Sequence, residues 1–298
     1  MIRTTDNEFI GQSVYDLQQA SQRLSHTQQQ ISTGLSINSV EDDPVGAALA
    51  LNLKTQLGNI TQYQKNIADT QSWMSASDSA IGSVQAVVQK AMTLAEQGAS
   101  GTMNQNDLNA IASQVGTLIS QARQSMNADY NGNYLFAGTK TTTQPYPASG
   151  LTYAGDANTM QRTIGSGVSV TLNQPGFQVF SSPPTGAGQN VLQLLTQVQQ
   201  DLQTGNTQAL STTDATALAT INDQLSSARA VVGSSINQLT DQTTRLQSLQ
   251  ASVQSLLSNT EDADMAKTML DYTNQQTVYQ AALQSAAKVI QPSLVNFL

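Results

Sequence analysis

Large apolar residues recur every three, four or seven positions along most of this chain. The first block consists of Ile10, Leu17, Leu24 and Ile31, with Val14 and Leu35 on the neighbouring row. The second keeps a seven-residue repeat over Leu53, Ile60, Ile67, Met74, Ile81, Val88 and Ala95. A strict seven-residue repeat stays buried when helices wind around each other in a left-handed supercoil. The pattern therefore predicts long α-helices packed in a bundle.

The same spacing returns in three later blocks. The third block is Leu108, Ile111, Val115, Leu118 and Ala122. The fourth is Leu218, Ile221, Leu225, Ala228, Val232, Leu239, Leu246, Leu249, Val253 and Leu256. The last is Met265, Met269, Tyr272, Tyr279, Leu283, Ala286 and Ile290, which carries an apolar stripe almost to the end of the sequence. A stripe in that place calls for another surface to cover it.

Capping residues indicate where helices begin. Asp43 is a good N-cap, and Pro44 follows at the first helical position, where its missing N–H costs nothing. Ser258 and Glu261 have the spacing of a capping box, which predicts a further helix start there. Two glycines interrupt the second block, and a new helix is expected near residues 104–107.

The middle of the chain has a different pattern. Residues 141–190 are rich in proline and glycine, and "VSVTLN" (168–173) alternates as a strand does. "DYNGNYLF" (129–136) predicts a hairpin with a tight turn at Asn131-Gly132. The fold class is therefore mainly α, a long-helix bundle or coiled coil with a small β-rich insert domain.

Three parts are expected. Terminal helices occupy residues 1–43 and 258–298, a helical bundle with a β-hairpin occupies 44–140 and 190–257, and a small outer β-rich domain occupies 141–189. Each terminal stripe spans roughly 39 Å of helix. Ordering the ends costs about 1–2 kcal/mol of backbone conformational entropy per residue. Each fully buried Leu or Ile contributes about 1.5–3 kcal/mol, and the two stripes contain few such residues. We expect ends that order only on assembly; a fraying intramolecular coiled coil is the alternative.

Composition narrows the possible functions. The net charge is −8 and the basic residues are scattered, whereas nucleic-acid binding needs a basic face. Absence of cysteine excludes disulfides and thiol chemistry. The longest apolar run, 45–53, is too short to span a membrane. The first residues do not have the pattern of a cleavable signal peptide. We expect a soluble chain without nucleic-acid partners, exported, if at all, without such a signal.

No catalytic, cofactor or metal site is expected. His26 is the only histidine and is interpreted as a solvated surface residue. The acids at 41–43 are explained by helix capping, and "GSG" (165–167) is neither a nucleophile elbow nor a phosphate loop. Trp73 lies beside the apolar column and is interpreted as packing. The sequence therefore does not indicate an enzyme.

Both ends resemble the flagellin family. "QQQISTGLSINSVEDDPVGAALA" (28–50) is similar to its N-terminal signature, and "EDADMAKTMLDYTNQQTVYQAALQSAAKVIQPSLVNFL" (261–298) to its C-terminus. "NGNYLFAGTKTTTQPY" (131–146) and "YAGDANTMQRTIGSGVSVTLNQPGFQVF" (153–180) are similar to the members that join hook to filament. The resemblance implies a structural protein of the bacterial flagellum, outside the cell at the hook–filament junction. Terminal helices would form an inner tube, the helical arms its wall, and the insert would project outward.

The resemblance also implies partners and an interface. The partners are copies of the chain in a helical or ring lattice, the hook-side junction protein, flagellin, and a type III export chaperone at the C-terminal region. The implied assembly surface is Leu17, Leu24, Ile31, Leu35, Met265, Met269, Leu283 and Ile290. Pro292 departs from a regular final helix, which leaves the packing of 293–298 open.

Two other functions remain open. One is a filament flagellin, which would have the same ends. The other is a secreted adhesin that uses aromatic residues of the insert, Tyr146, Tyr153 and Phe177. A catalytic insert would need clustered titratable groups, but Asp156 and Arg162 are its only charges.

Overall fold

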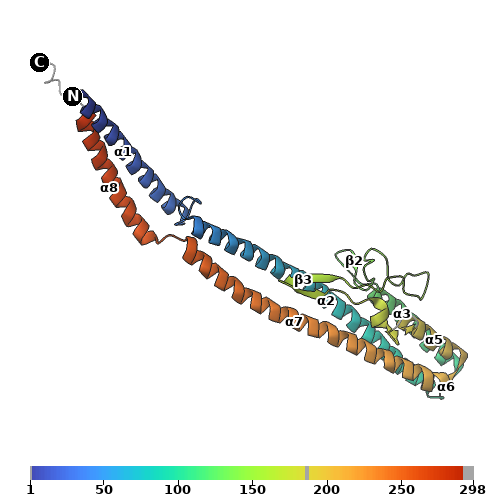
Figure 1. Cartoon of the computed structure of the whole chain (residues 1–298). Helices are drawn as coiled ribbons and strands as arrows, with labels where there is room; N and C mark the ends of the chain where they lie inside the picture. The colour runs from blue at the N-terminus through green and yellow to red at the C-terminus, as the bar shows by residue number, and fades with distance from the viewer. Residues whose placement is uncertain (1, 185–187, 291–298) are drawn as a thin grey trace. The chain divides into compact units, whose positions relative to one another are not determined.

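The structure, a computed structural model, describes residues 2–184 and 188–290, apart from some side chains near the two ends. It is mainly helical, as predicted (Figure 1). The long helices are α1 (Ile2–Thr33), α2 (Pro44–Ala99), α3 (Gln105–Met126), α5 (Val191–Thr204), α7 (Ala215–Glu261) and α8 (Met265–Ile290). Short segments are α4 (Gly176–Phe180), α6 (Thr207–Ala209) and the π-helical η1 (Leu210–Asp214).

Within the described ranges, strands form three antiparallel pairs. These are β1 (Asp129–Tyr130) with β2 (Asn133–Tyr134), β3 (Gln161–Gly165) with β4 (Val168–Thr171), and β5 (Ser181–Ser182) with β6 (Gln189–Asn190). The predicted turn is confirmed, because Asn131 and Gly132 both have positive φ, 51° and 78°, as a type I′ hairpin turn requires. The predicted strand of the insert is confirmed as β4.

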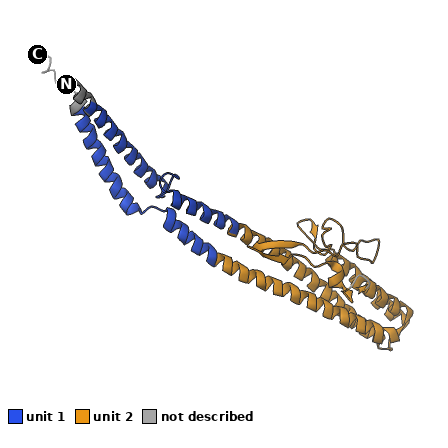
Figure 2. Cartoon of the chain, in the orientation of Figure 1, with its two compact units in different colours: residues 1–59, 248–298 blue, residues 60–247 orange. Residues whose placement is uncertain are grey.

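The chain divides into two compact units, which Figure 2 colours separately. Unit 1 consists of residues 1–59 and 248–298, and unit 2 of residues 60–247. Unit 1 therefore contains α1, α8 and the adjoining ends of α2 and α7. Unit 2 contains the rest of α2 and α7, together with the strands that the structure describes.

The seven-residue repeat forms the core of unit 2. Its members on α2 are buried: Ile60, Ile67, Met74, Ile81, Val88 and Ala95. Those on α7 are buried as well: Leu218, Ile221, Leu225, Ala228, Val232, Leu239 and Leu246. Polar side chains join the two helices along the edge of this seam. Arg229 binds both carboxylate oxygens of Asp78 at 2.9 and 3.1 Å, and Gln85 Nε2 donates to Ser226 at 2.9 Å.

The β-rich insert is held against both long helices. The side-chain amide of Asn66 on α2 donates to the carbonyl of Thr163 at 2.8 Å. The side-chain amide of Gln242 on α7 donates to the carbonyl of the next residue of β3, Ile164, at 3.2 Å. Because consecutive carbonyls of β3 bind different helices, the β3–β4 hairpin lies across α2 and α7 of unit 2.

The insert has its own small aromatic core. Phe136, Tyr146 and Phe180 are fully buried, while Tyr153 and Phe177 are half-buried and pack against each other. Phe180 makes edge-to-face contacts with both Phe136 and Tyr146. The aromatic residues on which an adhesive surface would depend therefore serve largely as packing.

Two details of the helical prediction are wrong. Ser258 does not begin a helix, because α7 continues to Glu261; α8 begins at Met265, where Asp264 Oδ1 accepts from the backbone N–H of Ala266 at 3.0 Å. Leu249 and Leu256 are exposed, not buried. They lie three residues after Leu246 and Val253, on the flank of the stripe, and the buried row instead continues through Val253 to Leu257.

Candidate assembly interface

Helices α1 and α8 pack side by side and antiparallel within unit 1 (Figure 1). On α1, Ala20 and Thr27 are buried, and Leu17, Leu24 and Ile31 are half-buried. On α8 the matching row, spaced by three or four residues, is Thr268, Tyr272, Gln275, Tyr279, Ala282 and Ala286. Such spacing puts one face of each helix into the contact. Small and polar residues make up much of the α8 row, which lets the helices approach but buries little large apolar surface.

Most of the large apolar residues of α8 lie outside that contact. Met265, Met269 and Leu283 are exposed and fall within roughly 40° of one another around the helix. Leu270 and Val278 are more exposed, at 63% and 54%; Leu270 lies opposite the buried row, and Val278 lies on the other flank of that row. We call the surface of α8 outside the contact with α1, which carries these five residues, the open face of α8. Contiguous exposed apolar patches on a protein surface are typical of protein–protein contacts.

The predicted interface residues fall into different environments. Met265, Met269 and Leu283 belong to the open face. Leu17, Leu24 and Ile31 are half-buried in the row of α1 beside α8, and Leu35 follows the end of α1. The side chain of Ile290 and residues 291–298, including Pro292, lie outside the described residues. Sequence reasoning missed Leu270 and Val278, whose eight-residue separation was the available signal for a second row.

The two helix breaks of unit 1 are hydrogen-bonded to each other. Gly34 ends α1 with φ of 73°, a conformation that glycine adopts freely. Leu35 then forms an antiparallel bridge with Asp262 in the short link between α7 and α8. Ser36 N–H donates to the carbonyl of Glu261 at 2.7 Å, and Ala263 N–H donates to that of Gly34 at 2.9 Å. The link before α8 is therefore fixed to the link after α1.

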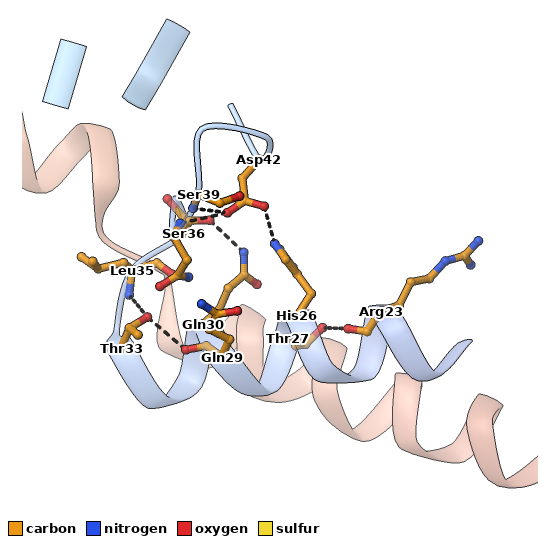
Figure 3. Close-up of polar contacts among 11 residues, drawn as sticks. Arg23, His26, Thr27, Gln29, Gln30, Thr33, Leu35, Ser36, Ser39 and Asp42 are labelled. Atoms are coloured by element: carbon orange, nitrogen blue, oxygen red, sulfur yellow. Dashed lines mark hydrogen bonds and ion pairs between the residues drawn. The ribbon is translucent and has the colours of Figure 1, made fainter. Parts of the chain in front are cut away.

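We call these two hydrogen-bonded links, residues 34–36 and 261–263, the joint of unit 1, and side chains also stabilise it. Glu261 is buried and pairs with Lys54 Nζ of α2 at 2.6 Å. Figure 3 shows His26 of α1 pointing at Asp42, with His26 Nε2 2.9 Å from Asp42 Oδ1. Asp42 also accepts from the backbone N–H groups of Ser39 and Asn38 at 2.8 and 2.9 Å. These hydrogen bonds, Ser39 first, with a smaller contribution from His26, lower the pKa of Asp42 to about 2.

The environment of His26 corrects one interpretation and leaves another intact. His26 is partly exposed but holds the folded loop after α1, so it is not simply a solvated surface residue. Asp43 caps α2 as predicted, since its Oδ1 accepts from Val45 N–H at 3.1 Å.

Among the described residues, His, Asp and Glu side chains form no group of three that could hold a metal ion. None of the described helices is long and apolar enough to cross a bilayer.

Family models match both ends of the chain. The model of the bacterial flagellin N-terminal helical region matches residues 12–141, and that of the C-terminal helical region matches residues 215–298. Together they cover more than half of the chain. The chain belongs to the flagellin family. The helices that carry the joint and the open face of α8 are thus the helices that define this family.

Similar proteins within the family include the flagellar hook-associated protein 3 of Escherichia coli K12. It is 27% identical over 277 residues, 86% of this chain and 87% of that protein. The flagellar filament 33 kDa core protein of Treponema phagedenis is 25% identical over 88% of this chain and 87% of its own length. A solved Vibrio parahaemolyticus structure, described as a flagellar hook-associated protein, superposes with a TM-score of 0.69 at 23% identity, over 74% of this chain and 100% of that one. That similarity supports the fold.

Proposed function

We propose that this chain is a structural subunit of the bacterial flagellum that joins the hook to the filament. The observation that carries the proposal is the match with hook-associated protein 3 along nearly the whole length of both proteins, insert included. The proposed neighbours are the hook-side junction protein, flagellin and further copies of the chain. Before assembly, an export chaperone would bind the C-terminal region.

The open face of α8 supports a role in assembly. Helix α1 covers only the row from Thr268 to Ala286, so Met269, Leu270, Val278 and Leu283 remain in water in the single chain. Each such side chain contributes about 1.5–3 kcal/mol when fully buried. Neighbouring subunits that cover this face would provide the burial that α1 does not. The eight residues predicted as the assembly surface, Ile290 among them, are retained in this proposal.

A second candidate function is that of a filament subunit. The Treponema phagedenis filament core protein supports it, because that protein also matches along most of its length. Both functions use the same terminal helices, so the position of the chain along the flagellum distinguishes them.

Gold-labelled antibody raised against residues 141–184 should decide the position on intact flagellated cells. We expect label at one point between hook and filament in electron micrographs. A strain that lacks the gene controls for antibody specificity. Label along the whole filament would contradict the junction role and favour the filament subunit. Label away from the flagellum would contradict both.

Limited proteolysis should reveal when the ends become ordered. In dilute monomer we expect cleavage within residues 1–43 and 258–290 before any cleavage within 60–247, because the residues that α1 and α8 bury fully, Ala20, Thr27, Thr268 and Ala286, are small or polar. Assembled flagella should protect the same ends. Ends that resist protease in the monomer as strongly as residues 60–247 would mean that the α1–α8 pair is stable alone.

A further inference from the structure

Two carboxyl groups are buried together at the end of unit 2 where α5 connects to α7. Asp201 lies in the last turn of α5 and is 7% exposed. Asp214 is the last residue of the π-helical segment η1 and is 2% exposed. Neither residue serves the assembly surface, and neither forms an ion pair with a basic group of the described chain. Buried acids without a cation need another source of stabilisation.

Both oxygens of Asp201 are hydrogen-bonded. The amide of Gln197 donates to its Oδ2 at 2.7 Å, and the amide of Asn206 donates to its Oδ1 at 3.0 Å. Among the described residues, no group of three His, Asp or Glu side chains at this place could hold a metal ion. A proton is therefore the positive charge considered for the pair.

Asp214 has the surroundings of a protonated acid. Its Oδ2 is buried and has no hydrogen-bond partner among the described residues. Burial, followed by the charge of Asp201 and a hydrogen bond between the two side chains, raises the pKa of Asp214 to about 6. A proton held between the two groups would satisfy a hydrogen bond and remove the like-charge repulsion.

In the described elements next to this pair, the other titratable groups near it in sequence are acids. Asp201 is the only titratable residue of α5, and α6 has none. On α7 the nearest is Asp223, which is exposed and nine residues away. Glu96, near the end of α2, and Asp107, in the first turn of α3, are also exposed acids. Asp223, Glu96 and Asp107 are all acids, so none of them supplies the positive charge that would stabilise a second buried carboxylate.

Asp214 belongs to the π-helical segment η1, which connects α5 and α6 to α7. A π-helix is rare, and such segments are frequent at functional sites. Leu210 at its start is buried next to Gly98, where an added Cβ would clash with the side chain of Leu202 of α5. We propose that Asp201 and Asp214 form a proton-operated latch: a shared proton closes η1 onto α5, and loss of that proton to solvent loosens the junction between α5 and α7.

The direction of the pH effect follows from the raised pKa. The ordinary pKa of an Asp is 3.8, whereas burial beside Asp201 raises the pKa of the folded Asp214 to about 6. Stability from this group is therefore complete below about pH 4 and falls as pH rises to about 6, by up to about 100-fold in the folding equilibrium constant. Asp42 and Asp156 have pKa values lowered to about 2, so their opposite effect lies below about pH 4.

Thermal unfolding of the full chain at pH 4.5 and pH 7 tests the latch. We expect the wild-type melting temperature to be higher at pH 4.5. Asp214→Asn, which resembles the protonated acid, should raise the melting temperature at pH 7 and remove most of the difference. Asp223→Asn is the matched control, because it removes an exposed acid of α7 and should leave the difference unchanged.

Two local readouts complete the test. Carboxyl-carbon NMR should place the midpoint of Asp214 near pH 6, and Asp201→Asn should lower that midpoint. Amide hydrogen exchange at pH 7 should be slower over residues 201–218 in Asp214→Asn than in the wild-type chain. An Asp214 midpoint near 4, an Asp214→Asn protein less stable than wild type at pH 7, or equal exchange in both proteins would each overturn the proposal.

Discussion

Leu283→Glu is expected to abolish incorporation of the chain into flagella. Leu283 lies on the open face of α8 with 42% of its surface exposed, so glutamate is tolerated in the single chain. In an assembly that covers this face, the carboxylate would be buried without a partner, at a cost of several kcal/mol. Each 1.4 kcal/mol weakens binding about tenfold. Because every copy in a lattice repeats the contact, the loss applies at each subunit.

Complementation of a strain that lacks the gene measures this effect. We expect Leu283→Glu cells to show no motility halo and no antibody label on the flagellum, while the purified variant keeps wild-type helix content. Gln284→Glu is the matched control, because it adds the same charge at the adjacent exposed polar position. Wild-type motility of Leu283→Glu would show that the open face of α8 is not an assembly surface. Equal loss in both variants would show that added charge on this side of α8, and not loss of the Leu283 side chain, prevents assembly. Met269→Glu should behave as Leu283→Glu does.

The sequence predicted the parts of the fold that depend on local periodicity. A seven-residue repeat kept over α2 leaves only one way to bury its apolar residues, and Ile67 and Ile81 are indeed buried. The tight turn at Asn131 and the cap at Asp43 were also predictable, because each depends on neighbouring residues only. Long helices with short caps therefore follow from the residues themselves.

Long-range contacts account for the errors. The spacing of Ser258 and Glu261 fits a capping box, but Glu261 pairs with Lys54 and its carbonyl accepts from Ser36. These partners lie more than 200 residues away in the sequence and set the end of α7. The same holds for His26, whose contact with Asp42 depends on a folded loop.

The open face of α8 could be predicted only in part. The seven-residue rule selects one stripe per helix, and on α8 it combined exposed residues such as Met269 with the half-buried Tyr272 and Tyr279. Which of these residues faces α1 depends on how α8 is rotated about its own axis. The contact between α1 and α8 sets that rotation, and the sequence of α8 alone does not. Leu270 and Val278 were missed because a helix with apolar residues on several sides has no single stripe.

Phe180→Ala is expected to cause the largest loss of stability in the insert. Phe180 is fully buried, and its ring lies 4.8 Å from that of Phe136 and 6.1 Å from that of Tyr146, centroid to centroid. Removing a buried phenylalanine ring costs about 3–5 kcal/mol. For a domain of this size the melting temperature should fall by roughly 6–20 °C, as measured by thermal unfolding.

Tyr146→Phe separates loss of packing from loss of a polar group in the same core. The Tyr146 hydroxyl is buried and has no hydrogen-bond partner among the described residues. A buried group without a partner costs about 1–3 kcal/mol, so its removal should leave stability unchanged or raise it by about 1 kcal/mol. If Tyr146→Phe instead destabilises the chain by more than 1 kcal/mol, the hydroxyl is hydrogen-bonded in solution. If Phe180→Ala costs less than 1 kcal/mol, the aromatic cluster is not the core that holds the insert against α2 and α7.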